Sequence, residues 1–244
     1  KMKSSNETVV RSSNVDRVLV IMAKAPRPGP VKTRLTPGLS AETVTSFYRC
    51  LLSDTLGLAR SLTSVEVAIM CPKSDVDELE QLAGEEVSVV AQNGEGLAAG
   101  LTSVFAHFAE DYRRRIIAFN SDSPHLPRSI LEDAFEMLAA HDVVVGPTTD
   151  GGYYLVGAQT FHPALFASDG MGTSSALERL LLSAQALELS VGLVDPFYDI
   201  DVADDMVRLA AELHLAPMRA PRTAQWLNER KIVMPQPRTD TEKL

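Results

Sequence analysis

Acidic residues follow three of the apolar segments in this sequence. Asp122 comes directly after a run of large apolar residues, Asp150 precedes two glycines, and Asp199 and Asp201 alternate near position 200. Mg²⁺ prefers one or two carboxylates together with water and phosphate oxygens, and alternation along an extended chain places Asp199 and Asp201 on the same side. The pattern therefore favours a metal site over an acid–base pair formed by the protein alone.

Structural interpretations of these carboxylates compete with the chemical one. Asp122 and Ser123 could cap the helix that Pro127 begins. Asp201, with Asp204 and Asp205, could cap and polarise the helix that follows it. Asp199 lies outside that cap, so helix capping does not explain it. At least one carboxylate of the set is therefore left for ligand chemistry.

The residues between the first apolar run and the first helix form a loop rich in proline, glycine and positive charge. Cations together with backbone N–H groups at a helix start can bind a polyphosphate, although a solvated basic loop would have the same composition. A kinase-type P-loop is excluded, because its required glycines would fall on Pro26 and Val31. The cations of the loop are Lys24, Arg27, Lys32 and Arg34.

Apolar runs and amphipathic stretches alternate from residue 17 to about residue 215. We expect strands at 17–23, 65–70, 87–90, 116–119, 142–147, 153–157 and 191–194. We expect helices near 40–60, 74–82, 97–108, 127–138, 177–187 and 206–213, and a short one containing Trp226. This alternation predicts an α/β fold, a mostly parallel sheet with helices on both faces. No helix fits between 142–147 and 153–157, so these two strands should be antiparallel or splayed.

This order of elements also predicts where a ligand would bind. Asp122 falls at the carboxyl end of a predicted strand, and ligands of open α/β sheets bind at that edge. A single catalytic domain should span residues 16–230. We expect a disordered leader at 1–15 and a loose tail at 231–244.

Composition narrows the class of protein. The 244 residues are 45% hydrophobic, which is enough for the core of one domain, and the net charge of −9 argues against a nucleic-acid partner. Cys50 and Cys71 form no metal-binding spacing and no disulfide framework. Neither a secretion signal nor a run of about 18 apolar residues is present, so we expect a cytoplasmic protein without a membrane span.

Four segments in order along the chain resemble a known family. They span about residues 17 to 210 and are Ala23–Leu35, Ser121–Pro127, Asp150–Tyr154 and Tyr198–Asp201. Together they look like a bacterial glycosyltransferase-like family that has the GT-A, or nucleotide-diphospho-sugar transferase, fold and is related to phospholactate guanylyltransferase. Two segments depart from the pattern: the first loop is proline-rich instead of glycine-rich, and Gly152-Tyr153-Tyr154 replaces a segment rich in glycine and threonine.

The resemblance implies a mixed sheet with an NTP or a nucleotide sugar over its carboxyl edge. It implies Mg²⁺ (or Mn²⁺) bound by Asp122, Asp199 and Asp201. The residues expected near the nucleotide are Lys24, Arg27, Lys32, Thr33 and Arg34 at the phosphates and Gly94, Gly96 and Leu97 at the base. The residues expected near the acceptor are Gly151, Gly152, Gly172, Thr173 and Ser175. The candidate catalytic residues are Lys32, Asp122 and Asp150.

Three functions remain open from the sequence. The first is nucleotidyl transfer from an NTP to a small phosphorylated acceptor with release of pyrophosphate, which needs no protein nucleophile. The second is glycosyl transfer from a nucleotide sugar, for which Asp150 or His125 could act as the base. The third is a nucleotide sensor without catalysis. The partner in each case is a small molecule, and a homodimer is compatible with all three.

Overall fold

A computed structural model describes residues 15–29, 31–36, 38–109, 114–167 and 174–230, and the structural account is confined to these ranges. Apart from residue 15, the predicted leader and tail lie outside them. Within these ranges the strands are β1 Arg17–Met22, β2 Glu66–Cys71, β3 Ser88–Ala91, β4 Arg115–Asn120, β5 Val143–Pro147, β6 Tyr153–Ala158 and β7 Val191–Leu193. The α-helices are α1 Ala41–Ser61, α2 Val76–Ala83, α3 Gly96–Phe108, α4 Arg128–Met137, α5 Ala176–Ala186, α6 Ala203–Leu215 and α7 Pro221–Glu229.

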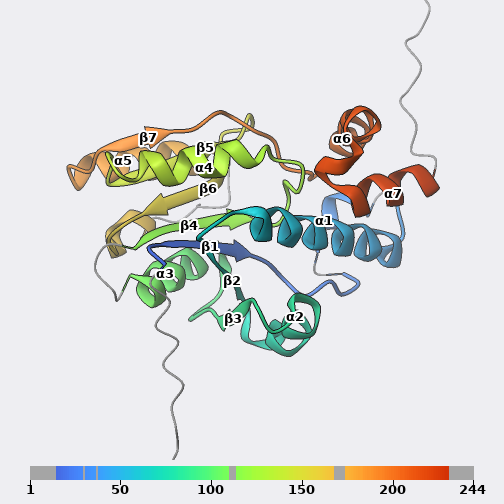
Figure 1. Cartoon of the computed structure of the whole chain (residues 1–244), viewed down its shortest axis with the longest axis horizontal. Helices are drawn as coiled ribbons and strands as arrows, with labels where there is room; N and C mark the ends of the chain where they lie inside the picture. The colour runs from blue at the N-terminus through green and yellow to red at the C-terminus, as the bar shows by residue number, and fades with distance from the viewer. Residues whose placement is uncertain (1–14, 30, 37, 110–113, 168–173, 231–244) are drawn as a thin grey trace, which may run out of the picture.

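The strands form one mixed sheet in the order β3-β2-β1-β4-β6-β5-β7 (Figure 1). Only β6 runs against its neighbours, since it is antiparallel to both β4 and β5 among the described strands. The predicted antiparallel pairing of 142–147 with 153–157 is confirmed, with Val145 opposite Val156. Its cause is the short connection between them, which cannot hold the crossover that parallel strands need.

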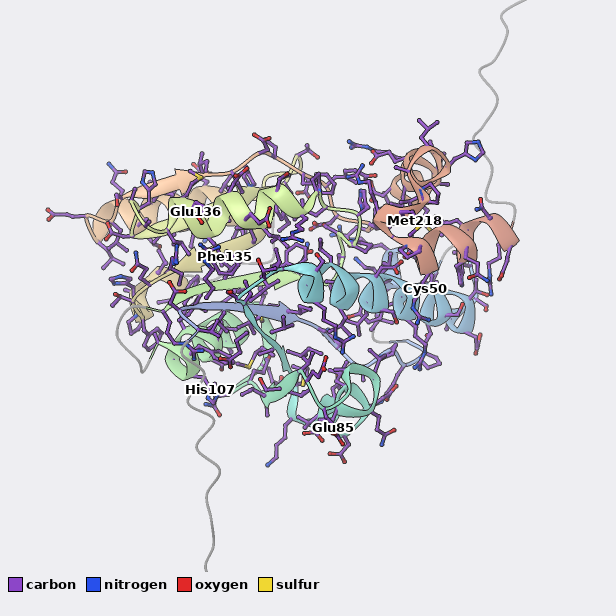
Figure 2. The ribbon with its side chains drawn as sticks, viewed as in Figure 1. Cys50, Glu85, His107, Phe135, Glu136 and Met218 are labelled. Carbon is purple, nitrogen blue, oxygen red and sulfur yellow. The ribbon has the colours of Figure 1, made fainter. Side chains whose placement is uncertain are left out.

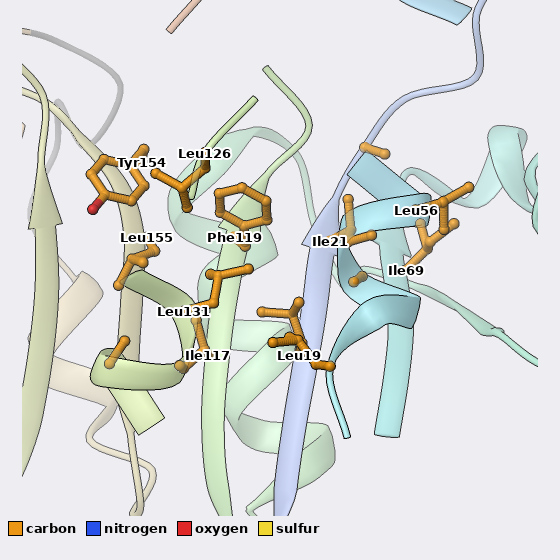
Figure 3. Packing of buried hydrophobic residues seen from close by; sticks show 14 of the residues in the cluster. Leu19, Ile21, Leu56, Ile69, Ile117, Phe119, Leu126, Leu131, Tyr154 and Leu155 are labelled. Carbon is orange, nitrogen blue, oxygen red and sulfur yellow. The ribbon is translucent and has the colours of Figure 1, made fainter. Parts of the chain in front are cut away.

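Helices cover both faces of the sheet, as the sequence predicted. Side chains of β1 alternate between the faces, because successive residues of a strand point in opposite directions. Leu19 and Ile21 pack with residues of α1 and α4, including Leu56 and Leu131 (Figure 3). Val18 and Val20 pack on the other face with residues of α3 and α5. The mostly parallel α/β arrangement is therefore confirmed.

Helix α4 shows how the amphipathic pattern fixes one of these helices. Phe135 is fully buried against the sheet, whereas its neighbour Glu136 is exposed and forms an ion pair with Arg17 at 2.6 Å (Figure 2). The helix begins after Pro127, where the sequence predicted it. None of the helices in the described ranges has both the length and the apolar character that crossing a bilayer requires.

A third apolar cluster joins α6 and α7 to α1 at one end of the molecule (Figure 1). Phe47 of α1 packs against Trp226 of α7 with a ring separation of 4.8 Å. Tyr198 and Ile200 are buried in the same cluster. Because these two residues point into the cluster, the intervening Asp199 and the following Asp201 face away from it.

Candidate functional site

Two segments that are far apart in the sequence meet at the carboxyl edge of the sheet. The loop 121–127 follows β4, and the segment 198–201 leads from β7 to α6. The backbone N–H of Ile200 donates to the carbonyl of Asp122 at 3.1 Å. This hydrogen bond places the two carboxylate-bearing segments side by side, and burial of Ile200 fixes which side chains face the site.

Lys32 lies between two of the predicted carboxylates. Its Nζ is 2.9 Å from Asp122 Oδ2 and 2.8 Å from Asp201 Oδ1. The Lys32 side chain is only 5% exposed, while the Asp122 and Asp201 side chains are 28% and 39% exposed. Burial alone would lower the pKa of Lys32, but Asp122 and Asp201 outweigh it and raise that pKa above its ordinary value. Lys32 is therefore a cation held between two acids.

Asp199 is the most enclosed of the three predicted metal ligands. Its Oδ1 accepts hydrogen bonds from Asn120 Nδ2 at 2.7 Å and from Ser123 Oγ at 3.0 Å. Burial, followed by the negative charge of Asp122, raises the pKa of Asp199 to about 7. The raised pKa therefore follows mainly from the enclosed position of Asp199, and the charge of Lys32 offsets it only in part.

A cavity of about 900 Å³ opens beside these carboxylates. Tyr48 of α1 also lines it; its hydroxyl lies 3.0 Å from Ser121 Oγ and accepts from the N–H of Lys24 at 3.2 Å, and burial raises its pKa to about 12. Every lysine of the described ranges lines this cavity, namely Lys24, Lys32 and Lys73. The other predicted site residues that line it are Gly94, Gly96, Leu97, Asp122 and Asp201.

Several other lining residues were missed by sequence reasoning. Met22, Met70 and Gln92 lie at or beside the ends of strands. An apolar or amide side chain at such a position indicates only an ordinary core residue. Tyr48 belongs to the apolar stripe of α1, so its sequence context predicts burial and gives no sign of its polar contact. Lys73 directly precedes the predicted polar helix at 74–82, and nothing in the sequence indicated a role for it. Only the order of the strands brings these positions to one cavity.

Arg27, a predicted phosphate ligand, does not line the cavity. Its guanidinium is 2.8 Å from Glu78 Oε2 and 3.1 Å from Asp75 Oδ1. Asp75 also accepts from the backbone N–H of Ala25 at 2.8 Å. Arg27 thus fastens the basic loop to the start of α2. Thr33 and Arg34 lie exposed in a 3₁₀ turn outside the cavity lining, with Arg34 Nη1 3.6 Å from Asp201 Oδ2.

The predicted acceptor residues lie on a neighbouring loop. Asp150 accepts from Thr148 Oγ1 at 2.5 Å, a bond that lowers its pKa. Gly151 has φ +92°, and an added Cβ would collide with the backbone carbonyl of Ser174. The carbonyl of Gly151 accepts from Leu177 of α5 at 3.1 Å. Gly151 is therefore packed beside Ser174, just before α5, and Gly152 lies beside Thr148. Ser175 is the residue before α5, and Gly172 and Thr173 lie outside the described residues.

His125 is enclosed in the protein and does not line the cavity. It is fully buried, its ring packs 4.8 Å from the rings of Phe197 and Tyr198, and neither ring nitrogen has a hydrogen-bond partner among the described residues. Burial, followed by the nearby Arg219 and Arg208, lowers its pKa to about 3. A base must reach its substrate, so the hypothesis that His125 is the base is wrong.

The fit of the carboxylates to a divalent cation can be judged from their chemistry. Within the described ranges no group of three or more acidic, histidine or cysteine side chains is arranged to hold a metal. Asp122 and Asp201 nevertheless supply two partly exposed carboxylates beside the cavity, and Mg²⁺ takes its remaining ligands from water and phosphate. These two residues therefore fit a cation that arrives with a polyphosphate, and the Mg²⁺ site stays a prediction.

Comparison with known proteins agrees with this architecture. The sequence signature of a family described as "Uncharacterized protein conserved in bacteria (DUF2064)" matches residues 55–173. None of the proteins with curated functions matches the chain.

Solved structures share the fold. A protein of Desulfovibrio desulfuricans G20, provisionally described as a nucleotide-diphospho-sugar transferase, is 23% identical with a TM-score of 0.82, over 90% of this chain and 99% of that one. The 4-diphosphocytidyl-2C-methyl-D-erythritol synthase of Anaerococcus prevotii DSM 20548 is 12% identical with a TM-score of 0.55, over 82% and 97% of the two chains. CMP:2-keto-3-deoxy-manno-octonic acid synthetase, solved with CTP, is 12% identical with a TM-score of 0.52, over 82% and 99%. The chain has the nucleotide-diphospho-sugar transferase fold.

Proposed function

We propose that this protein is a transferase that moves a nucleotidyl group from an NTP to a small phosphorylated acceptor and releases pyrophosphate. The observation that carries the proposal is the gathering of Lys24, Lys32, Lys73, Asp122 and Asp201 around a cavity of about 900 Å³. Such a volume suits a nucleotide. A synthetase of the same fold is solved with CTP, which supports a nucleoside triphosphate as the donor.

The reaction needs charge neutralisation and alignment more than it needs a protein nucleophile. A phosphate oxygen of the acceptor attacks the α-phosphorus, the bond from that phosphorus to the oxygen leading to the β-phosphate breaks, and pyrophosphate leaves with the electron pair. An anionic acceptor is already deprotonated, so no protein base is required. Lys24 and Lys73 line the cavity without an ion pair among the described residues, so both ammonium groups are available for the phosphates.

The carboxylates have a separate part in this proposal. Asp122 and Asp201 would hold a divalent cation, with Asp199 adding negative charge behind them. Such a cation, when bound, neutralises charge on the triphosphate and on the departing pyrophosphate. Asn120 and Ser123 orient Asp199 through the hydrogen bonds to its Oδ1. The protein thereby fixes the position of negative charge before the donor arrives.

The acceptor would lie toward Gly151, Gly152 and the start of α5. Arg34 supports this placement, since it is 3.6 Å from Asp201 and its charge also lowers the pKa of Asp150, a smaller cause than the hydrogen bond from Thr148. Arg34 is therefore beside Asp201, and its charge also acts on Asp150. Its exposed guanidinium could bind the phosphate of an acceptor.

Glycosyl transfer from a nucleotide sugar is the second candidate. It is favoured by the likeness to the Desulfovibrio protein described as a nucleotide-diphospho-sugar transferase. An inverting transfer would need a base, and Asp150 is the remaining candidate now that His125 is excluded. The lowered pKa of Asp150 makes it a weaker base, which favours nucleotidyl transfer.

Product analysis tests the proposal. The protein is incubated with Mg²⁺ and each common NTP in the presence of a panel of small phosphorylated alcohols and acids, and pyrophosphate is measured. A parallel series uses nucleotide sugars with hydroxyl acceptors, and free nucleoside diphosphate is measured. Pyrophosphate from one NTP–acceptor pair supports the proposal. Nucleoside diphosphate alone would indicate glycosyl transfer, and tight nucleotide binding without either product would indicate a sensor.

A further inference from the structure

The ammonium of Lys32 occupies the position between the two carboxylates that suit a divalent cation. It contacts Asp122 Oδ2 at 2.9 Å and Asp201 Oδ1 at 2.8 Å, and its side chain is almost fully buried. A lysine that binds phosphate would instead point its ammonium into the cavity, as an exposed lysine can. The sequence predicted that Lys32 binds phosphate, and the structure gives it carboxylate partners.

The backbone at Lys32 is also unusual. Its φ of 49° and ψ of 43° fall in the left-handed region, which residues other than glycine seldom adopt and which is concentrated at functional sites. The side chain enters the site from this conformation, and its two ion pairs help to compensate for it.

We propose that Lys32 is an internal counter-ion that keeps the divalent-cation position closed until the phosphates of a nucleotide draw its ammonium away. The inference rests on the proposed function, because it assumes a nucleotide–metal complex as the ligand. Two cations cannot share the space between Asp122 and Asp201, so metal alone must compete with Lys32. A triphosphate brings both the metal and a new anionic partner for the displaced ammonium. Binding of the two ligands is then strongly coupled.

Two other lysines provide the contrast that the test needs. Lys24 lines the same cavity and carries the same charge, but it has no ion pair among the described residues. Substitution of Lys24 changes the charge of the cavity without vacating the position between the carboxylates. Lys73 is in the same situation. Direct competition between Lys32 and the metal can therefore be separated from the general effect of the cavity's charge on metal affinity.

The first experiment measures binding of Mn²⁺ alone, without nucleotide, by electron paramagnetic resonance of the free ion. K32M and K32Q should bind Mn²⁺ at least about tenfold more tightly than the wild-type protein, since an interaction between two ligands of this kind is typically worth that factor. K24M should change the affinity much less, because it leaves the Lys32 ammonium between Asp122 and Asp201. Equal affinity of wild type, K32M and K32Q, or an equal gain in K24M, would overturn the inference.

A second measurement uses the wild-type protein and does not depend on whether the variants fold. Lysines are labelled with an amine-specific reagent and quantified by mass spectrometry. Lys32 should react much more slowly than Lys24 and Lys73, and Mn²⁺ alone should leave it protected. Rapid labelling of Lys32 in the free protein, or exposure by Mn²⁺ alone, would contradict the inference. Neither measurement uses turnover, so the inference can fail while pyrophosphate release stands, and the reverse.

Discussion

The hydroxyl of Ser123 donates a hydrogen bond to Oδ1 of Asp199 at 3.0 Å, and the same hydroxyl lies 3.1 Å from the backbone carbonyl of Tyr198. Ser123 follows β4, and Asp199 comes 76 residues later. The contact joins the two segments that carry the carboxylates. Because Ser123 is fully buried, water cannot replace this contact.

Ser123→Ala should therefore lower the free energy of unfolding by about 1–3 kcal/mol, because it removes a buried donor from the Tyr198 carbonyl and from Asp199 Oδ1, and Asn120 compensates only at Asp199. Ser53→Ala is the matched control, since the Ser53 hydroxyl donates within its own helix, to the carbonyl of Arg49, and has no other partner in the part of the chain that the structure describes. Urea denaturation of both variants measures the difference. A loss in Ser123→Ala no larger than in Ser53→Ala would show that the contact does not stabilise the site.

Buried His125 predicts a dependence of stability on pH. Its pKa is lowered from 6.5 to about 3 in the folded protein, chiefly by burial and then by Arg219 and Arg208, while Glu212 faces it at 3.7 Å. The unfolded chain takes up a proton below about pH 6.5 and the folded protein does not, so acid favours unfolding. Stability should fall by about 1.4 kcal/mol per unit as the pH decreases from about 6 toward 4 through this residue.

The histidine contribution is isolated by comparison with His125→Phe. The variant keeps an aromatic ring beside Phe197 and Tyr198 but cannot titrate. Its unfolding free energy, measured by urea denaturation from pH 4 to 8, should fall less steeply in acid than that of the wild type. Identical slopes in the two proteins would mean that His125 is protonated in the folded state.

Substitution of Gly151 should affect stability and binding on the proposed acceptor side. Gly151→Ala places a methyl group against the Ser174 carbonyl and forces a side chain into a backbone with φ +92°, which should cost about 1–3 kcal/mol. Gly57→Ala in α1 is the control, since a Cβ there meets nothing within 4 Å and should stabilise the helix by about 0.5–1 kcal/mol. With an identified acceptor, Gly151→Ala should raise the KM for the acceptor more than the KM for the NTP. A larger effect on the NTP would place the loop on the donor side.

Lys24 and Lys73 should contribute to nucleotide binding in a salt-dependent way. Lys24→Met and Lys73→Met should each weaken NTP binding by about tenfold at low salt, and the difference should shrink as salt is raised. Neither change should lower stability, because neither lysine forms an ion pair among the described residues. Arg128→Met on α4 removes a charge whose ion-pair partner among the described residues is Glu132, and it serves as the control. Calorimetric titration at two salt concentrations measures the affinities. If the lysine variants bind NTP as tightly as the wild-type protein, these lysines do not contact the nucleotide.

Local patterns predicted most of the fold. Apolar runs and helical stripes identified the strands and helices in order, because burial on one or both faces leaves a periodic pattern in the sequence. The short connection after β5 predicted its antiparallel partner. The insertion of β6 between β4 and β5 was not predicted, since the pairing of β6 with β4 joins residues such as Leu155 and Phe119 that local patterns cannot relate.

The candidate site was predicted in position and less well in its contacts. Asp122, Asp199 and Asp201 were placed by the rule that ligands meet strand ends, and the structure brings their segments together. The partners of Lys32 and Arg27 were not predicted, because a lysine or arginine in a loop has the same sequence whether it faces phosphate or carboxylate. Those partners depend on chain segments tens of residues away.

In the proposed function, Asp122 and Asp201 bind the divalent cation of a nucleotide beside the cavity. Calorimetric titration of NTPs with and without Mg²⁺ tests it most directly, using Asp122→Asn, Asp201→Asn and, as an exposed control, Asp142→Asn. At least one NTP should bind in a Mg²⁺-dependent way. Asp122→Asn and Asp201→Asn should each weaken this binding by about 30-fold, or roughly 2 kcal/mol. Asp142→Asn should leave it unchanged. No NTP binding, or binding that is equal without Mg²⁺ and in all the variants, would contradict it.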